Sequence, residues 1–134
     1  MASLRLISAS LRVFGDDLDP DSVSALLGGA PNWAHRKGQT LDGDALPAPT
    51  GAWVLEAPSP ESGEIEEQVA VLFSGLTGDF DEWSTLTSQF AVTVHCELEA
   101  SDDAAVFDLS PRLAQSLAER GVVISFGVSV NLSS

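Results

Sequence analysis

The sequence predicts an α+β fold in which three to four helices pack on one mixed, mostly antiparallel sheet of about five strands. Segments whose apolar side chains alternate with polar ones are interspersed with segments whose apolar side chains recur every three or four residues. The chain has 134 residues, of which 44% are hydrophobic. This is enough for one core over residues 1–134 without disulfides or a structural metal.

A change of pattern predicts the first strand and the first helix. Residues 4–14 carry apolar side chains on both faces, which is typical of a central strand. Asp19 can then cap a helix, and Pro20 suits the first helical position because its missing N–H leaves nothing unpaired there. Gly28 should end this helix, since glycine adopts the left-handed conformation without steric cost. Residues 29–50 follow as a proline-rich loop, which is either functional or mobile.

The rest of the chain predicts four strands and three amphipathic helices. The strands are expected at residues 52–56, 90–98, 105–107 (the weakest) and 122–130. The helices are expected to begin after Ser59-Pro60, after Gly78 and at Ser110-Pro111, and the last should end at Gly121.

The charge and composition of the chain argue against several classes of partner. Twenty Asp and Glu residues against six Lys and Arg give a net charge of -14. We expect no nucleic-acid partner and no membrane partner, because phosphates are bound mainly by Lys and Arg. The sequence lacks an apolar run of the roughly 20 residues that a membrane helix needs, and its first residues lack the apolar core of a signal peptide. Together with a single Cys, these features predict a cytoplasmic protein.

The few cations are unevenly placed. No Lys or Arg occurs in residues 38–111, whereas the run at residues 33–38 combines Arg36 and Lys37 with His35 and an aromatic ring. Such groups can hold a carboxylate or phosphate by charge-assisted hydrogen bonds. Alternatively, these cations only pair with neighbouring carboxylates. The candidate ligand-binding residues are Trp33, His35, Arg36, Lys37, Gly38 and Trp53.

The sequence predicts no catalytic residue, no metal ligand and no cofactor. It lacks the familiar nucleotide-binding, hydrolase, metalloprotease and redox motifs. His95 and Cys96 are adjacent in a predicted strand and should point to opposite faces, so they cannot act together. Residues 16–21 place Asp at alternate positions as in a calcium loop, but Ser22 stands where that loop needs Gly and Gly28 where it needs Glu.

Several fragments occur together in a characteristic order and spacing. They are the strand that ends at Gly15, Asp17-Leu18-Asp19-Pro20, Leu26-Leu27-Gly28, Arg36-Lys37-Gly38, Trp53 with Leu55-Glu56, the long acidic helix, and Leu109-Ser110-Pro111 with Leu117. In this respect the chain resembles a bacterial family, domain of unknown function 4279, over about residues 6–130. It departs from the family in its insert between Gly38 and Gly51 and at its C-terminal end. The resemblance implies a small bacterial α+β domain and brings no activity, substrate or catalytic residue.

These observations favour a non-enzymatic, acidic protein-binding module of the inhibitor or immunity type, with a basic protein as its partner. The alternative is a small-anion or ligand-binding domain that uses the loop at residues 33–38. Acidity that serves only solubility and an enzyme that uses paired carboxylates are further alternatives. A homodimer through a sheet edge or the final strand is also open.

Overall fold

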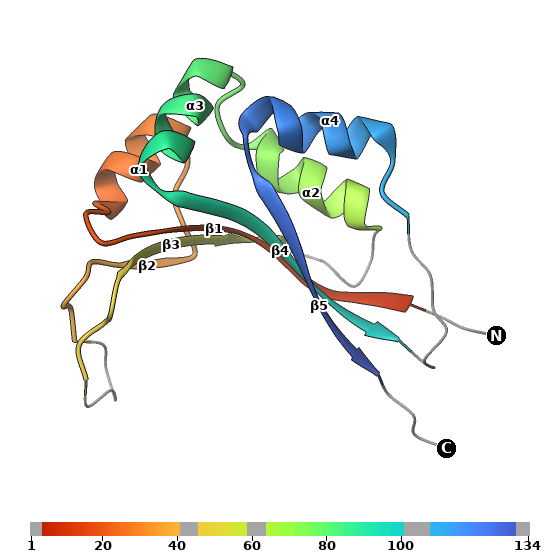
Figure 1. Ribbon diagram of the computed structural model, residues 1–134, viewed down its shortest axis with the longest axis horizontal. Coiled ribbons are helices and arrows are strands. Elements are labelled where there is room, and N and C mark those ends of the chain that lie inside the picture. The colour runs from red at the N-terminus through yellow and green to blue at the C-terminus, as the bar shows by residue number, and fades with distance from the viewer. Residues whose placement is uncertain (1–3, 41–45, 59–63, 101–107, 131–134) are drawn as a thin grey trace.

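The longest strand, β1 (Leu4–Gly15), forms the centre of a five-stranded sheet with the order β2-β3-β1-β4-β5. The computed structural model describes residues 4–40, 46–58, 64–100 and 108–130 (Figure 1). The side chains of Leu11 and Val13 are completely buried on the face of β1 that meets the helices. The predicted central strand is confirmed.

The sheet is mixed but mostly antiparallel, as predicted. β1 pairs antiparallel with β3 (Gly51–Glu56) and with β4 (Ala91–Ala100), and β2 (Trp33–His35) pairs antiparallel with β3. β5 (Val123–Val130) runs parallel to β4, because the chain crosses back over the sheet through a helix between these two strands.

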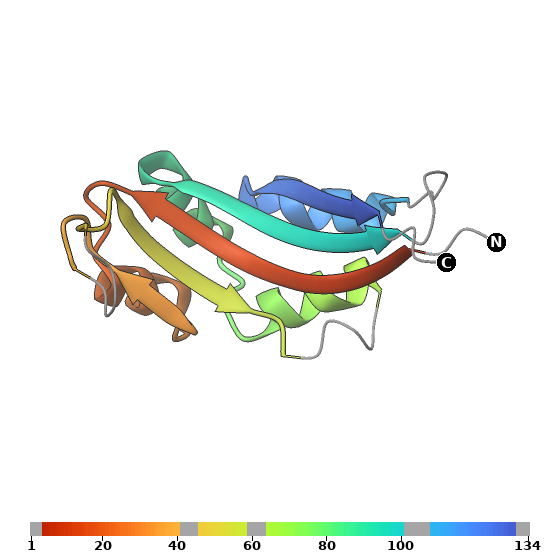
Figure 2. The same cartoon turned by 90° about the horizontal axis from the view of Figure 1, so that it is seen from below.

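The four described helices all lie on one face of the sheet (Figure 2). They are α1 (Pro20–Leu27), α2 (Ile65–Ser74), α3 (Phe80–Gln89) and α4 (Pro111–Arg120). The predicted caps of α1 and α4 are confirmed: the Asp19 side chain accepts a hydrogen bond from the Asp21 N–H, and Ser110 Oγ accepts one from the Leu113 N–H. Gly28 ends α1 in the left-handed conformation, with φ 76°.

The core fills the space between the helices and this face of the sheet. Trp53 from β3 and Trp83 from α3 are completely buried there, and the ring of Phe73 meets that of Trp83 edge to face. The opposite side of the sheet, called the open face below, carries the side chains that alternate with these core residues. It includes Arg12 and His95.

Some predicted elements differ from the structure. The loop predicted at residues 29–50 contains β2, which is only three residues long, and a bridge between Thr40 and Pro47. The helix that was predicted to begin after Ser59-Pro60 begins only at Ile65, with Glu64 in the N-cap position. Residues 59–60 themselves, and residues 105–107, where a strand was predicted, lie outside the described residues. No helix in the described ranges has both the length and the apolar character needed to cross a membrane.

Candidate functional site

The predicted basic loop is tied to the start of α1 by two ion pairs. Arg36 Nη2 donates to Asp19 Oδ1 at 2.7 Å, and Lys37 Nζ donates to Asp16 Oδ2 at 3.1 Å. Thr50 Oγ1 also donates to Asp16, at 3.0 Å. The structure therefore shows the arrangement in which the loop's cations pair with neighbouring carboxylates.

The environment of these two carboxyl groups lowers the pKa of both. Hydrogen bonds from Lys37 and Thr50, together with the charge of Lys37, lower the pKa of Asp16 from its ordinary value. Burial raises the pKa of Asp19, but hydrogen bonds from Ser22 and the Asp21 N–H and the charge of Arg36 outweigh that effect and lower it. Both groups are ionised at neutral pH, so an incoming anion would have to displace them from their cations.

Trp33 and His35 lie together on the open face. Their rings stack with centroids 5.7 Å apart and an interplanar angle of 19°. Trp33 is 46% exposed, and the Nδ1 atom of His35 is buried without a hydrogen-bond partner in the described structure. This pair of rings is the part of the predicted site that offers accessible aromatic surface.

Trp53 is separated from that surface. It lies opposite Ala34 in the register of β2 and β3, so its side chain points to the face away from Trp33 and His35. Its ring is completely buried, and its Nε1–H donates to Ser24 Oγ of α1 at 3.0 Å. The structure thus gives Trp53 a place in the core and does not bring it together with the other candidate residues.

Gly38 has a conformational role in the loop. Its φ of 84° lies in the left-handed region, and its N–H donates to the carbonyl oxygen of Ala48 at 2.9 Å. The glycine suits the turn over residues 36–39, in which the Gln39 N–H donates to the carbonyl oxygen of Arg36 at 3.1 Å.

Two other cations are held by internal contacts. On the open face, Arg12 Nε donates to Ser10 Oγ at 2.9 Å. The guanidinium carbon of Arg120 lies 4.3 Å from the centroid of the Phe73 ring, and its Nη1 donates to the carbonyl oxygen of Ser116. Burial lowers the pKa of Arg120. Sequence reasoning missed the contact of Arg12 with Ser10, although alternation along β1 places both side chains on one face.

A second cluster that the sequence did not predict joins β4 and β5. His95 Nδ1 lies 2.7 Å from Ser125 Oγ, and His95 Nε2 lies 2.5 Å from Glu97 Oε1. Gly127 leaves room for that carboxylate, because a Cβ there would lie 2.5 Å from Glu97 Oε1. Alternation along β4 could have paired His95 with Glu97, but the register that adds Ser125 cannot be read from the sequence. The hydroxyl, imidazole and carboxylate form one hydrogen-bonded chain across the open face.

Groups that might bind metal do not converge in the described part of the chain. No cluster of three or more His, Cys, Asp or Glu side chains suited to a metal ion occurs there. Cys96 is completely buried, and this burial raises the pKa of its thiol to about 11. In the aspartate-rich run at residues 16–21, Asp19 caps α1 and Asp16 pairs with Lys37.

Most carboxylates on the described surface have no cationic partner. Among the described residues, Lys and Arg form ion pairs only with Asp16, Asp19 and Glu99. The other exposed carboxylates, called the acidic surface below, are Asp17, Asp21, Glu56, Glu64, Glu67, Asp79, Asp81, Asp108 and Glu119. They occur in or just before the first turns of α1, α2 and α3, before and on α4, and at the end of β3, so the negative field extends over much of the helical layer.

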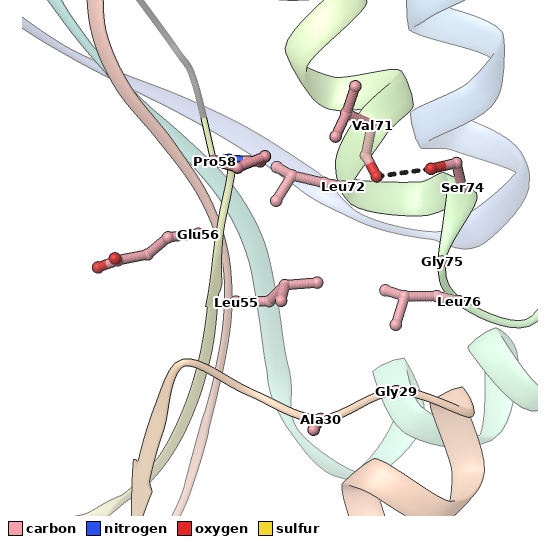
Figure 3. Close-up of a pocket in the computed structure, with 10 residues that line it drawn as sticks. All are labelled: Gly29, Ala30, Leu55, Glu56, Pro58, Val71, Leu72, Ser74, Gly75 and Leu76. Carbon is pink, nitrogen blue, oxygen red and sulfur yellow. Dashed lines mark hydrogen bonds between the residues drawn. The ribbon is translucent and has the colours of Figure 1, made fainter.

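A small pocket of about 240 Å³ lies between the end of β3 and α2 (Figure 3). Leu55, Leu72 and Leu76 point into it, while Glu56 points outward from the strand. The full lining is Gly29, Ala30, Leu55, Glu56, Pro58, Val71, Leu72, Ser74, Gly75 and Leu76. Its walls are mostly apolar. Sequence reasoning did not predict this pocket, because the lining comes from three separate parts of the chain.

The comparisons with known proteins give a family and no activity. The family model described as Domain of unknown function (DUF4279) matches residues 5–131, which is nearly the whole chain. Neither the curated proteins nor the solved structures contain a match.

Proposed function

We propose that this chain, which belongs to the DUF4279 family, is a non-enzymatic module that binds a basic protein partner, in the manner of an inhibitor or immunity protein. The observation that supports the proposal is the acidic surface, whose carboxylates form no ion pair with Lys or Arg among the described residues. Such a field accelerates encounter with a cationic surface and disfavours partners of the same sign.

The strength of this attraction depends on salt. The Debye length is about 8 Å at physiological ionic strength and about 3 Å at 1 M salt, so exposed charges act over a shorter range as salt rises. Binding through the acidic surface should therefore be strong in dilute buffer and weak in concentrated salt. A partner held by apolar contacts alone would show the opposite tendency or none.

The test is capture of partners from a lysate of the source organism on the immobilised protein, first in dilute buffer and then in 1 M salt. We expect a basic protein that is retained in the first buffer and released in the second. Replacing Glu64 and Glu67 with Gln should weaken its retention, whereas replacing both with Asp, which keeps the charge, should not. The absence of any basic partner, or a partner indifferent to both salt and the Gln variant, would contradict the proposal.

The alternative is a small-anion or ligand-binding domain that uses the loop at residues 33–38. The stacked, partly exposed rings of Trp33 and His35 favour it, and the ion pairs of Arg36 and Lys37 with Asp19 and Asp16 weigh against it. A thermal-shift screen with phosphates, nucleotides and carboxylates tests this alternative. It requires an anion that stabilises the wild type and does not stabilise the Arg36→Ala/Lys37→Ala variant.

A further inference from the structure

The pocket lies beside the part of β3 that no longer pairs with β2. β2 pairs only with residues 52–54 of β3, and the next stretch of β3 faces the end of α2 instead. There Leu55 and Leu76 point toward each other across the pocket (Figure 3). Val71 of α2 lines the same pocket and is 45% exposed. Apolar surface is thus accessible at this point of a highly charged molecule.

The size of the pocket indicates what can enter it. Sites for metabolites and drug-sized ligands commonly measure about 300–1,000 Å³. A volume of about 240 Å³ is below that range and suits one large aliphatic or aromatic side chain. Interfaces between proteins commonly concentrate their binding energy where one such side chain fills a pocket on the partner.

The backbone at the pocket does not favour addition of a strand. The N–H of Glu56 already donates to Asn32 Oδ1 at 2.7 Å, and Pro58, two residues later, has no N–H to offer. A bound segment would therefore make few backbone hydrogen bonds with this edge. Insertion of a side chain is the mode of binding that the geometry allows.

The charges around the pocket are negative. No Lys or Arg is among its lining residues, whereas the Glu56 carboxylate points away from the pocket, to the opposite side of β3. Glu67 lies one helical turn before Val71 on α2, which places it beside the pocket on the same side of the helix. A segment that approaches this pocket along α2 therefore meets the Glu67 carboxylate and no cation of the pocket lining.

We propose that this pocket, formed by β3 and the end of α2, is the docking point for the basic partner, which inserts one apolar side chain flanked by Lys or Arg residues. The inference rests on the proposed function and specifies where the partner binds. The inserted side chain contacts Leu55, Leu72 and Leu76, and a flanking cation lies near Glu67. The pocket confers selectivity among basic surfaces, because a polycation without an apolar side chain cannot fill it.

Two synthetic peptides and two glycine variants test this inference. The first peptide is a decamer of alternating Lys and Ser, and the second carries one Leu at its centre. Gly75 lines the pocket, has a φ of -91°, and an added Cβ there meets no atom within 4 Å, so Gly75→Leu adds a large apolar side chain at the wall of the pocket without strain. Gly78 is equally open and does not line the pocket, which makes Gly78→Leu the matched control.

Affinities are measured by NMR titration in dilute buffer, with thermal unfolding to confirm that each variant folds. We expect the Leu peptide to bind the wild type about tenfold more tightly than the Lys-Ser peptide, because burial of one Leu side chain supplies at least that factor. The gain should persist in Gly78→Leu and disappear in Gly75→Leu. The amide signals that shift with the Leu peptide should include Leu55 and Leu76.

The outcomes separate the two proposals. If both peptides bind with equal affinity, or if the gain survives in Gly75→Leu, the docking point is refuted and the acidic protein-binding function stands. If neither peptide binds in dilute buffer, the proposed function fails and the docking point fails with it.

Discussion

Two tryptophans on neighbouring strands should respond very differently to truncation. Trp53 is completely buried and hydrogen-bonded to Ser24, whereas Trp33 is 46% exposed and contacts the ring of His35. Trp53→Ala leaves a large cavity between β3 and α1, and truncations of this kind cost about 3–5 kcal/mol. Trp33→Ala loses a partly exposed stacking contact, which is worth about 1 kcal/mol.

The difference is large enough to measure by thermal unfolding. For a chain of this size, each kcal/mol corresponds to roughly 3–4 °C in Tm. Trp53→Ala should therefore lower Tm by roughly 10 °C or more, and Trp33→Ala by roughly 4 °C or less. Circular dichroism and urea unfolding of both variants give these values, and Trp53→Phe separates the loss of the hydrogen bond to Ser24 from the loss of the ring.

Fluorescence supplies an independent check. In the wild type, iodide should quench the emission of Trp33 more than that of the two buried tryptophans, Trp53 and Trp83, and the quenchable fraction should disappear in Trp33→Ala. Equal losses of Tm in the two alanine variants would refute the assignment of Trp53 to the core. So would a Trp53→Ala variant of unchanged stability.

Three further predictions follow from single positions. A Cβ at Gly51 would lie 2.8 Å from a backbone oxygen of β1, so Gly51→Ala should destabilise the fold by about 1–3 kcal/mol in urea unfolding, whereas the open Gly78→Ala should not. Burial raises the pKa of Cys96 from 9.0 to about 11. The unfolded chain releases this proton first, so stability should fall as pH rises from 9 to 11, and Cys96→Ala should remove that part of the slope. Asp16 has a lowered pKa, so its contribution is present above the ordinary value of 3.8 and is lost as pH falls through the lowered pKa. Lys37→Ala should shift the Asp16 titration, followed by carboxyl NMR, toward that ordinary value, and an unchanged titration would contradict the ion pair.

The sequence predicted the helix ends best, because their physics is local. Asp19, Ser110 and Gly28 act on backbone groups two to four residues away, so the residue types alone specify the caps. The same reasoning missed β2, whose three residues are too few to show a period. They are a strand only because β3, which lies far along the chain, offers a free edge to pair with.

The candidate site was less predictable, since it depends on which face a side chain occupies. Trp33 and Trp53 are both aromatic residues near the basic loop in sequence, but the register of β2 and β3 places them on opposite faces. The contacts of Arg36 with Asp19 and of Lys37 with Asp16 join residues 17 and 21 positions apart, and in so acidic a chain many carboxylates could have filled that role. Which carboxylate pairs with a given Lys or Arg depends on the fold. The composition predicts only that many carboxylates are available for such pairs.

Helix stabilisation alone does not explain the acidic surface. The helix dipole favours carboxylates in the first turn, where Asp21, Glu67 and Asp81 occur, and it favours Lys or Arg equally in the last turn. The last turns of α1, α2 and α3 contain no basic residue, and the Arg120 side chain in the last turn of α4 packs against aromatic rings. Each missing cation forgoes about 0.3–1 kcal/mol of available stability. If helix stability alone had determined these charges, Lys or Arg would also occupy the last turns of α1, α2 and α3. The excess of carboxylates therefore supports a role for the negative field in contacts with another molecule.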